Sequence, residues 1–236
     1  MKYKKPVVLG ILFFLPVIFL LFLYPSKHNY NALDIVRENV LDLSNFTSND
    51  DELVMLKDNI TVLGFLGEKP MSKATTALNL KELVYDKFMG FKRFQVVIVL
   101  PHEAKDELLA LEKELYKYEK LKYWKFVFGS KDEISKLYNS LKFSTVLDAN
   151  LATDDIFIID KELNQRGRID DRTEPQVAKN FPIYGMSTYN CIEVAELKNK
   201  MSEDMRILFT EYRQKRKGDF NSTTRRADDL KGNEEN

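Results

Sequence analysis

Few side chains in this sequence are suited to redox or metal chemistry. The 236 residues include one cysteine, Cys191, and two histidines, His28 and His102. A single cysteine excludes an intrachain disulfide, a CxxC redox pair and a zinc site built from thiolates. Two histidines argue against a histidine-rich metal site and against a Ser-His-Asp triad. Any catalytic or metal chemistry would therefore depend on isolated donors.

Four soft donors fall in or beside predicted loops: Met71, His102, Met186 and Cys191. Copper(I) prefers donors of this kind, but no ligand spacing joins the four, so ordinary packing is the alternative interpretation. Cys191 also begins the last predicted helix, where a thiolate would be stabilised. A reactive thiol and a small buried hydrophobic side chain are the two interpretations of this residue.

Lys69 and Lys73 flank Pro70 immediately before a predicted helix. The backbone N–H groups and dipole of a helix N-terminus favour negative charge. With Lys57 and Lys92 elsewhere, these lysines make a candidate site for a phosphate, a carboxylate or an acidic partner loop. The alternative is that they are solvent-exposed loop residues without a ligand.

Five aspartates at predicted strand ends and turns offer another candidate: Asp154, Asp155, Asp160, Asp170 and Asp171. Paired carboxylates can perform acid–base work. Aspartate is also a common turn residue, because its side chain accepts hydrogen bonds from nearby backbone N–H groups. Turn chemistry is therefore the competing interpretation.

The N-terminus has the pattern of a membrane anchor. Residues 1–6 carry three lysines, and residues 7–24 are uncharged and almost wholly apolar. About 18 apolar residues approach the thickness of a bilayer core. The positive-inside rule predicts a cytoplasmic N-terminus, a single pass through the cell membrane and an extracytoplasmic main domain, periplasmic in a bacterium. A cleaved signal peptide is the alternative, but the apolar run is long and no small-residue cleavage site follows it.

Beyond a juxtamembrane segment at residues 25–40, strand and helix patterns alternate. Residues 32–43 have helical spacing, although their end also fits a first strand. Apolar runs predict strands at 54–56, 60–66, 94–100, 124–128, 155–160 and 166–170, the last two forming a hairpin. Helices are predicted from Ser72 to about residue 90, over 105–121, and from Ser130, which with Glu133 forms a capping box. This order predicts an α/β fold with a mixed sheet.

The C-terminal third contains an irregular segment, a long helix and a tail. Residues 171–189 contain Pro and Gly and no periodic pattern, whereas residues 192–216 predict an amphipathic helix with a basic end. That helix either packs its apolar stripe on the sheet or lies on anionic lipid or a partner protein. The polar tail 218–236 is predicted to be disordered. Equal numbers of acidic and basic residues, 36 each, exclude a strongly basic nucleic-acid-binding domain.

Residues 41–170 resemble the SCO (SenC) family in the order and spacing of several segments. The matching segments are LKDNITVLGFLG, TTALNL, FQVVIVL, FVFGSKDEISKLYNSL and DIFIIDKELNQRGRID. The resemblance implies a thioredoxin-like fold over residues 41–217, including the long C-terminal helix. It also implies a membrane-anchored protein of a family of copper chaperones and thiol reductants that assist cytochrome oxidase assembly.

The family's functional residues do not carry over. The family uses C-P-x-x-C and a histidine just before the final hairpin as its copper and redox site. In this chain the two cysteine positions are Lys69 and Lys73, Pro70 is kept, and the histidine position falls at about Ala152. A lysine ammonium has no lone pair for copper(I), and thiol exchange requires a thiolate. The resemblance therefore implies a degenerate site without a cofactor.

These observations predict a non-catalytic, membrane-anchored binding or assembly factor on the extracytoplasmic face, within respiratory-complex biogenesis by analogy with the family. The implied partners are the membrane and a protein. One alternative is a redox or copper-handling protein with relocated chemistry at Cys191 or His102. Another is a lipid- or partner-docking protein that uses the C-terminal helix.

Overall fold

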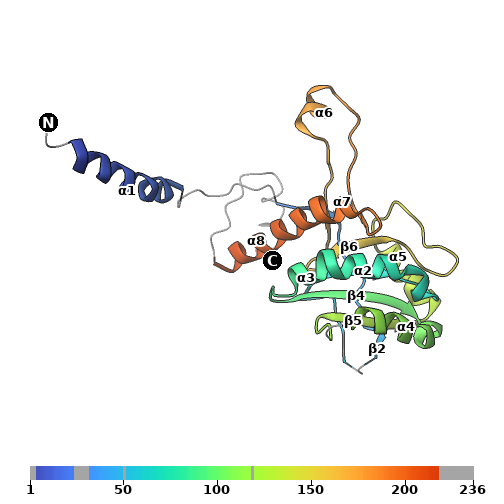
Figure 1. The fold of residues 1–236 in the computed structure, drawn as a ribbon. Coiled ribbons are helices and arrows are strands. Elements are labelled where there is room, and N and C mark those ends of the chain that lie inside the picture. Colours follow the sequence, from blue (N-terminus) through green and yellow to red (C-terminus); the bar gives the residue numbers. More distant parts are fainter. Residues whose placement is uncertain (1–3, 24–31, 50–51, 118–119, 218–236) are drawn as a thin grey trace.

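The computed structural model describes residues 4–23, 32–49, 52–117 and 120–217 (Figure 1). His28, part of the juxtamembrane segment and the predicted disordered tail lie outside these ranges. The apolar N-terminal segment is helical, as α1 (Lys4–Leu23), with Pro16 inside it. In the described ranges, no helix has both the length and the apolar character needed to cross a membrane.

Within the described residues, an eight-stranded mixed sheet forms the centre of the fold. Its order is β1-β7-β6-β3-β4-β5-β2, and β8 pairs with β6. Strands β3, β4 and β5 are parallel, whereas β6 is antiparallel to β3. The strands are Asp34–Arg37 (β1), Thr47–Ser48 (β2), Ile60–Phe65 (β3), Phe94–Pro101 (β4), Trp124–Gly129 (β5), Asp155–Ile159 (β6), Gln165–Gly167 (β7) and Tyr189–Asn190 (β8). The predicted mixed α/β sheet is confirmed.

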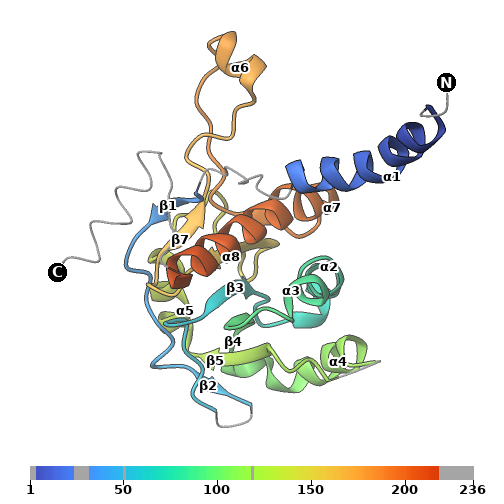
Figure 2. The same cartoon turned by 90° about the vertical axis from the view of Figure 1, so that its left-hand side faces the viewer.

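Helices cover both faces of this sheet (Figure 2). One face is covered by α2 (Ala74–Leu80), a π-helical turn (Lys81–Tyr85), α3 (Asp86–Phe88) and α4 (Lys105–Leu115). The other face is covered by α5 (Lys131–Asn139) and the segment around residues 40–56. Strands β3 and β4 contribute alternate side chains to the two cores, which is why both read as continuous apolar runs.

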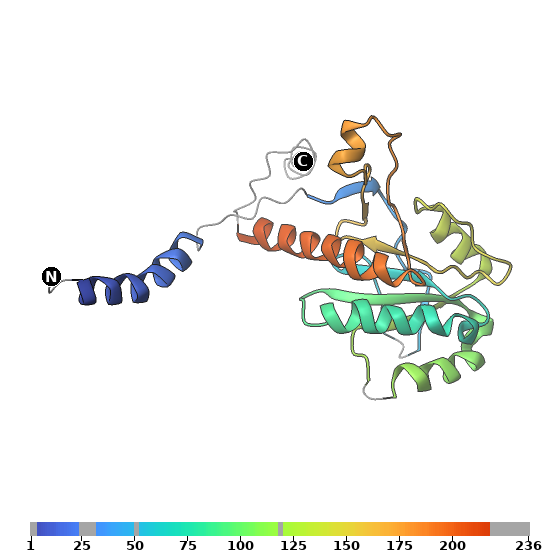
Figure 3. The ribbon, with the colours of Figure 1, turned by 45° about the horizontal axis from the view of Figure 1, so that its top comes forward.

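The long C-terminal helix packs on the same face as α2 and α4 (Figure 3). It consists of α7 (Val194–Glu196), a π-helical turn (Leu197–Met201) and α8 (Ser202–Lys217). Leu197, Met201, Met205 and Leu208 of its apolar stripe are fully buried. Phe209 stacks on Phe91 with ring centroids 4.2 Å apart. Of the two predicted arrangements, the structure shows the stripe on the sheet, while the basic end extends past the core.

Three local predictions were wrong. Residues 32–43 contain β1 instead of a helix, because Asp34–Arg37 pairs antiparallel with β7. Residues 54–56 form no strand, since the amide of Leu56 donates to the Asp42 carboxylate at 2.7 Å instead of to a neighbouring strand. The span 171–189 is more ordered than predicted, because it contains α6 (Glu174–Ala178) and the start of β8.

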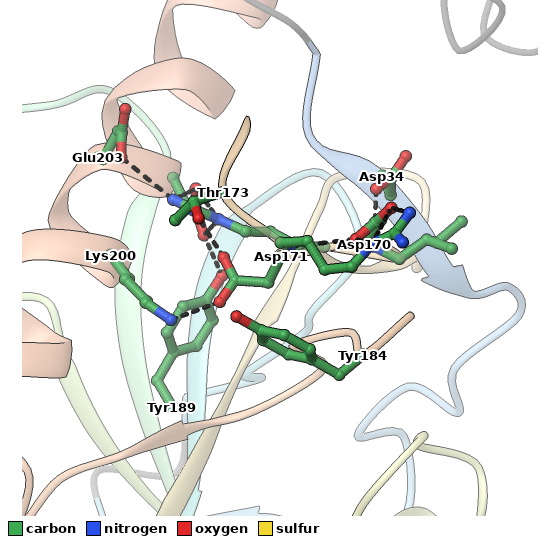
Figure 4. A network of polar contacts seen from close by, with 12 residues as sticks. Asp34, Asp170, Asp171, Thr173, Tyr184, Tyr189, Lys200 and Glu203 are labelled. Carbon is green, nitrogen blue, oxygen red and sulfur yellow. Dashed lines mark hydrogen bonds and ion pairs between the residues drawn. The ribbon is translucent and has the colours of Figure 1, made fainter. Parts of the chain in front are cut away.

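Residues 169–185, called the finger below, project from the domain with α6 near the tip (Figure 1). Arg168 and Met186 close its base by exchanging two backbone hydrogen bonds of 2.7 Å. A polar network fixes this base to α8 (Figure 4): Arg168 forms ion pairs with Asp204 at 2.7 Å and Asp171 at 2.9 Å, and Tyr189 donates to Asp204 at 2.6 Å. The finger therefore has an anchored base.

The buried Arg166 side chain connects the start of the domain, at Leu33, to its last helix, α8. The Arg166 guanidinium on β7 bonds to Asp160 at 3.0 Å and to Glu211 of α8 at 2.6 Å. It also donates to the carbonyl of Leu33 at 2.7 Å. All three charged side chains are almost completely buried. Buried charges are tolerated only when paired, so this cluster depends on every member.

Replacing Arg166 with methionine is expected to lower the free energy of unfolding by about 3–5 kcal/mol, because Asp160 and Glu211 would remain buried without a cation. Chemical denaturation of the purified chain measures this change. Arg206→Met, at an exposed position of α8, is the matched control and should change the free energy little. Adding Glu211→Gln to the Arg166→Met variant should recover part of the loss, and no recovery would contradict the assignment.

Candidate functional site

The candidate site begins where β3 ends. Leu66 forms an isolated antiparallel bridge with Ala152, which the SCO resemblance aligns with the family's histidine. Gly67 follows with φ +69°, and a Cβ atom there would lie 2.3 Å from the carbonyl oxygen of Asn150 and 2.9 Å from the Cβ of Ala152. Glycine is thus required for the chain to pass this closely. The structure brings Ala152 to the start of the loop that contains Lys69 and Lys73.

The 69–73 loop is a tight turn. Pro70 is buried and starts a 3-10 turn (Pro70–Lys73) that leads directly into α2. Ser72 donates its amide and its hydroxyl to the carbonyl of Lys69, at 2.9 and 2.7 Å. Ser72 was predicted to cap the helix, and this was wrong, because its hydroxyl serves the turn. Lys69 and Met71 are exposed.

Lys73 is bound within the site. Its Nζ atom lies 2.8 Å from Oδ2 of Asp154, and Thr76 of α2 donates to the other carboxylate oxygen. Burial raises the pKa of Asp154, but the hydrogen bonds from Lys73 and Thr76 and the charge of Lys73 outweigh it and hold this pKa below its usual value. The ammonium is therefore already neutralised by a carboxylate.

The four lysines of the predicted anion site are divided between two places. Lys69 and Lys73 follow the carboxyl end of β3. Lys57 and Lys92 precede β3 and β4, which are parallel, so these two lie at the opposite end of the sheet. The sequence could not show this separation without the strand register.

Cys191 lies beside the same carboxylate, although 118 residues separate it from Lys73 (191 minus 73). Its amide donates to the carbonyl of Asp154 at 2.8 Å, and Asn79 of α2 donates to its carbonyl at 2.9 Å. The thiol is fully buried, and burial together with the charges of Asp154, Asp155 and Glu196 raises its pKa well above the ordinary value. Of the two interpretations of Cys191, this burial favours a small packed hydrophobic side chain over a reactive thiol.

His102 follows the carboxyl end of β4, which is parallel to β3, so it lies at the same end of the sheet as the 69–73 loop. It begins a 3-10 turn (His102–Ala104) after β4 and is exposed. In the part of the chain that the structure describes, no group of three or more His, Cys, Asp or Glu side chains could hold a metal ion. Lys69, Lys73 and Ala152, the positions that the SCO resemblance aligns with the family's ligands, do not make a donor set that fits copper(I).

The other aspartates have structural partners. Asp160 binds Arg166, Asp170 binds Arg172 at 2.7 Å, and Asp171 binds Arg168. Asp155 is buried, and this burial, together with the charge of Asp154 and in part offset by a hydrogen bond from Thr145, raises the pKa of its carboxyl group. Thr76, which bonds to Asp154, and Asn79, which bonds to Cys191, also belong to this site but were not predicted from the sequence. Their polarity in an otherwise apolar helix segment is the only signal that could have indicated them.

Replacing Asp154 with asparagine is expected to lower the thermal midpoint at neutral pH. Because the folded pKa of Asp154 lies below its ordinary value of 3.8, the carboxylate stabilises the fold fully above that value and loses this effect as the pH falls through the lowered pKa. The difference between the two proteins should therefore shrink in acid. Glu114→Gln, at an exposed position of α4, is the control. A difference that persists unchanged in acid would contradict the ion pair as its cause.

Comparison with protein-family models gives no match, and comparison with curated proteins gives none. Among solved structures, the chain is similar to BsSco, a member of the Sco family of cytochrome c oxidase assembly proteins, at 14% identity and a TM-score of 0.52. The match covers 77% of this chain and 99% of BsSco. This chain has a thioredoxin-like fold.

Two further similarities are weaker. The soluble domain of Sco1 from Bacillus subtilis has a TM-score of 0.40 at 15% identity, over 73% of this chain and 91% of that one. The thioredoxin domain of a thiol-disulfide oxidoreductase from Bacteroides vulgatus has a TM-score of 0.39 at 14% identity, over 57% and 86%. The similarity to BsSco, at 14% identity, shows the fold alone, so function must be argued from the site itself.

Proposed function

We propose that this protein is a degenerate relative of the SCO family that acts as a non-catalytic binding or assembly factor. The observation that carries the proposal is the ion pair of Lys73 with Asp154 at the loop after β3. In the family this loop holds the thiols, whereas here Lys73 forms an ion pair with the Asp154 carboxylate, which also accepts a hydrogen bond from Thr76 of α2. The ion pair of Lys73 with Asp154 stabilises the scaffold, and it offers neither a thiolate nor a copper ligand.

The proposal includes a membrane anchor. The apolar residues 7–24 follow three lysines, and helix α1 (Lys4–Leu23) contains this segment as far as Leu23. These features support insertion with the N-terminus in the cytoplasm and the thioredoxin-like domain on the extracytoplasmic face. A role in respiratory-complex biogenesis rests on the fold analogy with Sco proteins.

The finger supports a binding role. Its exposed apolar side chains include Val177, Phe181, Tyr184 and Ile183, the last of which is 68% exposed. Exposed apolar groups gathered on one projection are a common mark of protein contact. Because the base is held by the Arg168 network, the finger can present these groups without ordering the whole segment on binding.

Photo-crosslinking in native membranes tests the binding role. A photoreactive phenylalanine analogue placed at Phe181 is expected to form a discrete adduct with a partner protein. The same analogue at Leu109, an exposed residue of α4, is the matched control and should not. The analogue is also placed at Lys69. An adduct from this position and none from Phe181 would show that the partner contacts the 69–73 loop instead of the finger. The absence of adducts at both Phe181 and Lys69 would overturn the binding role.

The competing proposal is redox or copper chemistry relocated to Cys191 or His102. The burial and raised pKa of the Cys191 thiol disfavour it. Cys191 is therefore expected to react with a thiol reagent only after unfolding, and the purified chain is expected to retain no copper(I) through dialysis. Stoichiometric copper, abolished by His102→Ala or Cys191→Ser, would establish the competing proposal instead.

A further inference from the structure

A cleft opens at the end of the sheet opposite the 69–73 loop. It has a volume of about 750 Å³ and lies where the N-terminal ends of β3 and β4 meet the last turns of α8. The residues that line it are Ile60, Gly90, Phe91, Lys92, Arg93, Lys161, Phe209, Tyr212, Arg213 and Arg216. None of these residues belongs to the candidate site described above.

The lining is strongly cationic. Five of its residues carry a positive charge and none carries a negative charge, in a chain whose formal net charge is zero. In the described ranges, none of the five forms an ion pair with a carboxylate. Glu211 pairs with Arg166, and Glu162 accepts a hydrogen bond from Tyr212 at the edge of the cleft, which leaves the five cations in excess. Such a concentration of unneutralised charge attracts an anion.

The floor of the cleft is apolar and aromatic. Phe209 is buried against Phe91, with an angle of 21° between the two rings. The Tyr212 ring lies beside them, and Lys161 Nζ is 4.9 Å from its centroid. A cationic rim over an apolar floor is complementary to an amphiphilic anion, which has a phosphate at one end and hydrocarbon at the other.

The route of the chain places the cleft near the attachment of α1. The carbonyl of Leu33 and the Glu211 carboxylate both bond to Arg166, and Glu211 precedes Tyr212 of the cleft. Residues 24–31 separate α1 from Ala32, and a linker of that length spans at most roughly 30 Å. If α1 is anchored in the membrane, as proposed above, this end of the domain is held within reach of the lipid headgroups.

We propose that this cleft binds an anionic phospholipid. The phosphate would be held by Arg213 and Arg216 of α8 and by Lys92 and Arg93, which precede β4. The glycerol and first acyl carbons would cover Phe91 and Phe209. The choice of a lipid over a soluble phosphate rests on the proposed membrane anchor. Binding would hold the thioredoxin-like domain against the membrane surface, so that the finger has a fixed orientation there.

The test uses the full chain in a non-ionic detergent, where binding depends on neither the anchor nor a partner protein. The probes are dihexanoyl phosphatidylglycerol, dihexanoyl phosphatidylcholine and inorganic phosphate, each titrated by microscale thermophoresis. The double variant Arg213→Gln/Arg216→Gln is compared with Arg206→Gln, at an exposed position of α8 that does not line the cleft. Circular dichroism melts show whether each variant is folded. Because these arginines are exposed, we expect the variants to fold as the wild type does.

We expect phosphatidylglycerol to bind more tightly than phosphatidylcholine, and the double variant to lose roughly 10-fold or more in affinity, since each basic residue near a lipid phosphate contributes about 1 kcal/mol. Arg206→Gln should bind as the wild type does. If inorganic phosphate binds as tightly as phosphatidylglycerol, the ligand is a soluble phosphate and the lipid assignment is overturned. Equal binding of the two lipids, or equal losses in both variants, would overturn the site. These outcomes are independent of the crosslinking result, which alone decides the binding role of the finger.

Discussion

The rest of the fold depends on the Arg166 guanidinium. It joins the carbonyl of Leu33, the Asp160 carboxylate after β6 and the Glu211 carboxylate of α8, all away from solvent. Because the charges are buried, the loss of any partner leaves another uncompensated. One interaction thereby sets where the chain enters the domain and how the last helix crosses the sheet. The finger base is bonded to α8 through Arg168 and Asp204, and α8 contributes part of the lining of the basic cleft.

The two ends of the sheet have different chemistry. At the carboxyl end of β3, Lys73 and Asp154 neutralise each other, and Cys191 is buried with its amide bonded to the carbonyl of Asp154. At the opposite end, the cations of the cleft have no carboxylate among the lining residues. Neutralised charge stabilises a scaffold, whereas unneutralised charge attracts a ligand. The position that is catalytic in the SCO family is therefore structural in our proposal, and recognition is assigned to the finger and the cleft.

The sequence predicted the central architecture well because its signals are local. The runs that became β3 and β4 are continuous and β-branched, the Ser130–Glu133 capping box is present, and the stripe of α8 has helical spacing. Errors fell where non-local partners override local pattern. Residues 32–43 follow the edge of β7, and Leu56 bonds to Asp42. A single sequence contains no record of such pairings.

The amino-acid sequence alone determined the absence of a thiol pair, the presence of Lys69 and Lys73 around Pro70 in the loop, and the alternating order of strands and helices. These are facts of composition and period, which need no contacts. Only the tertiary structure decided that Lys73 is paired with Asp154, that Cys191 lies beside that carboxylate, and that α8 adds its arginines to Lys92, Arg93 and Lys161. Parallel strand register and helix packing bring these residues together, because electrostatic and packing energies act between neighbours in space and not in sequence.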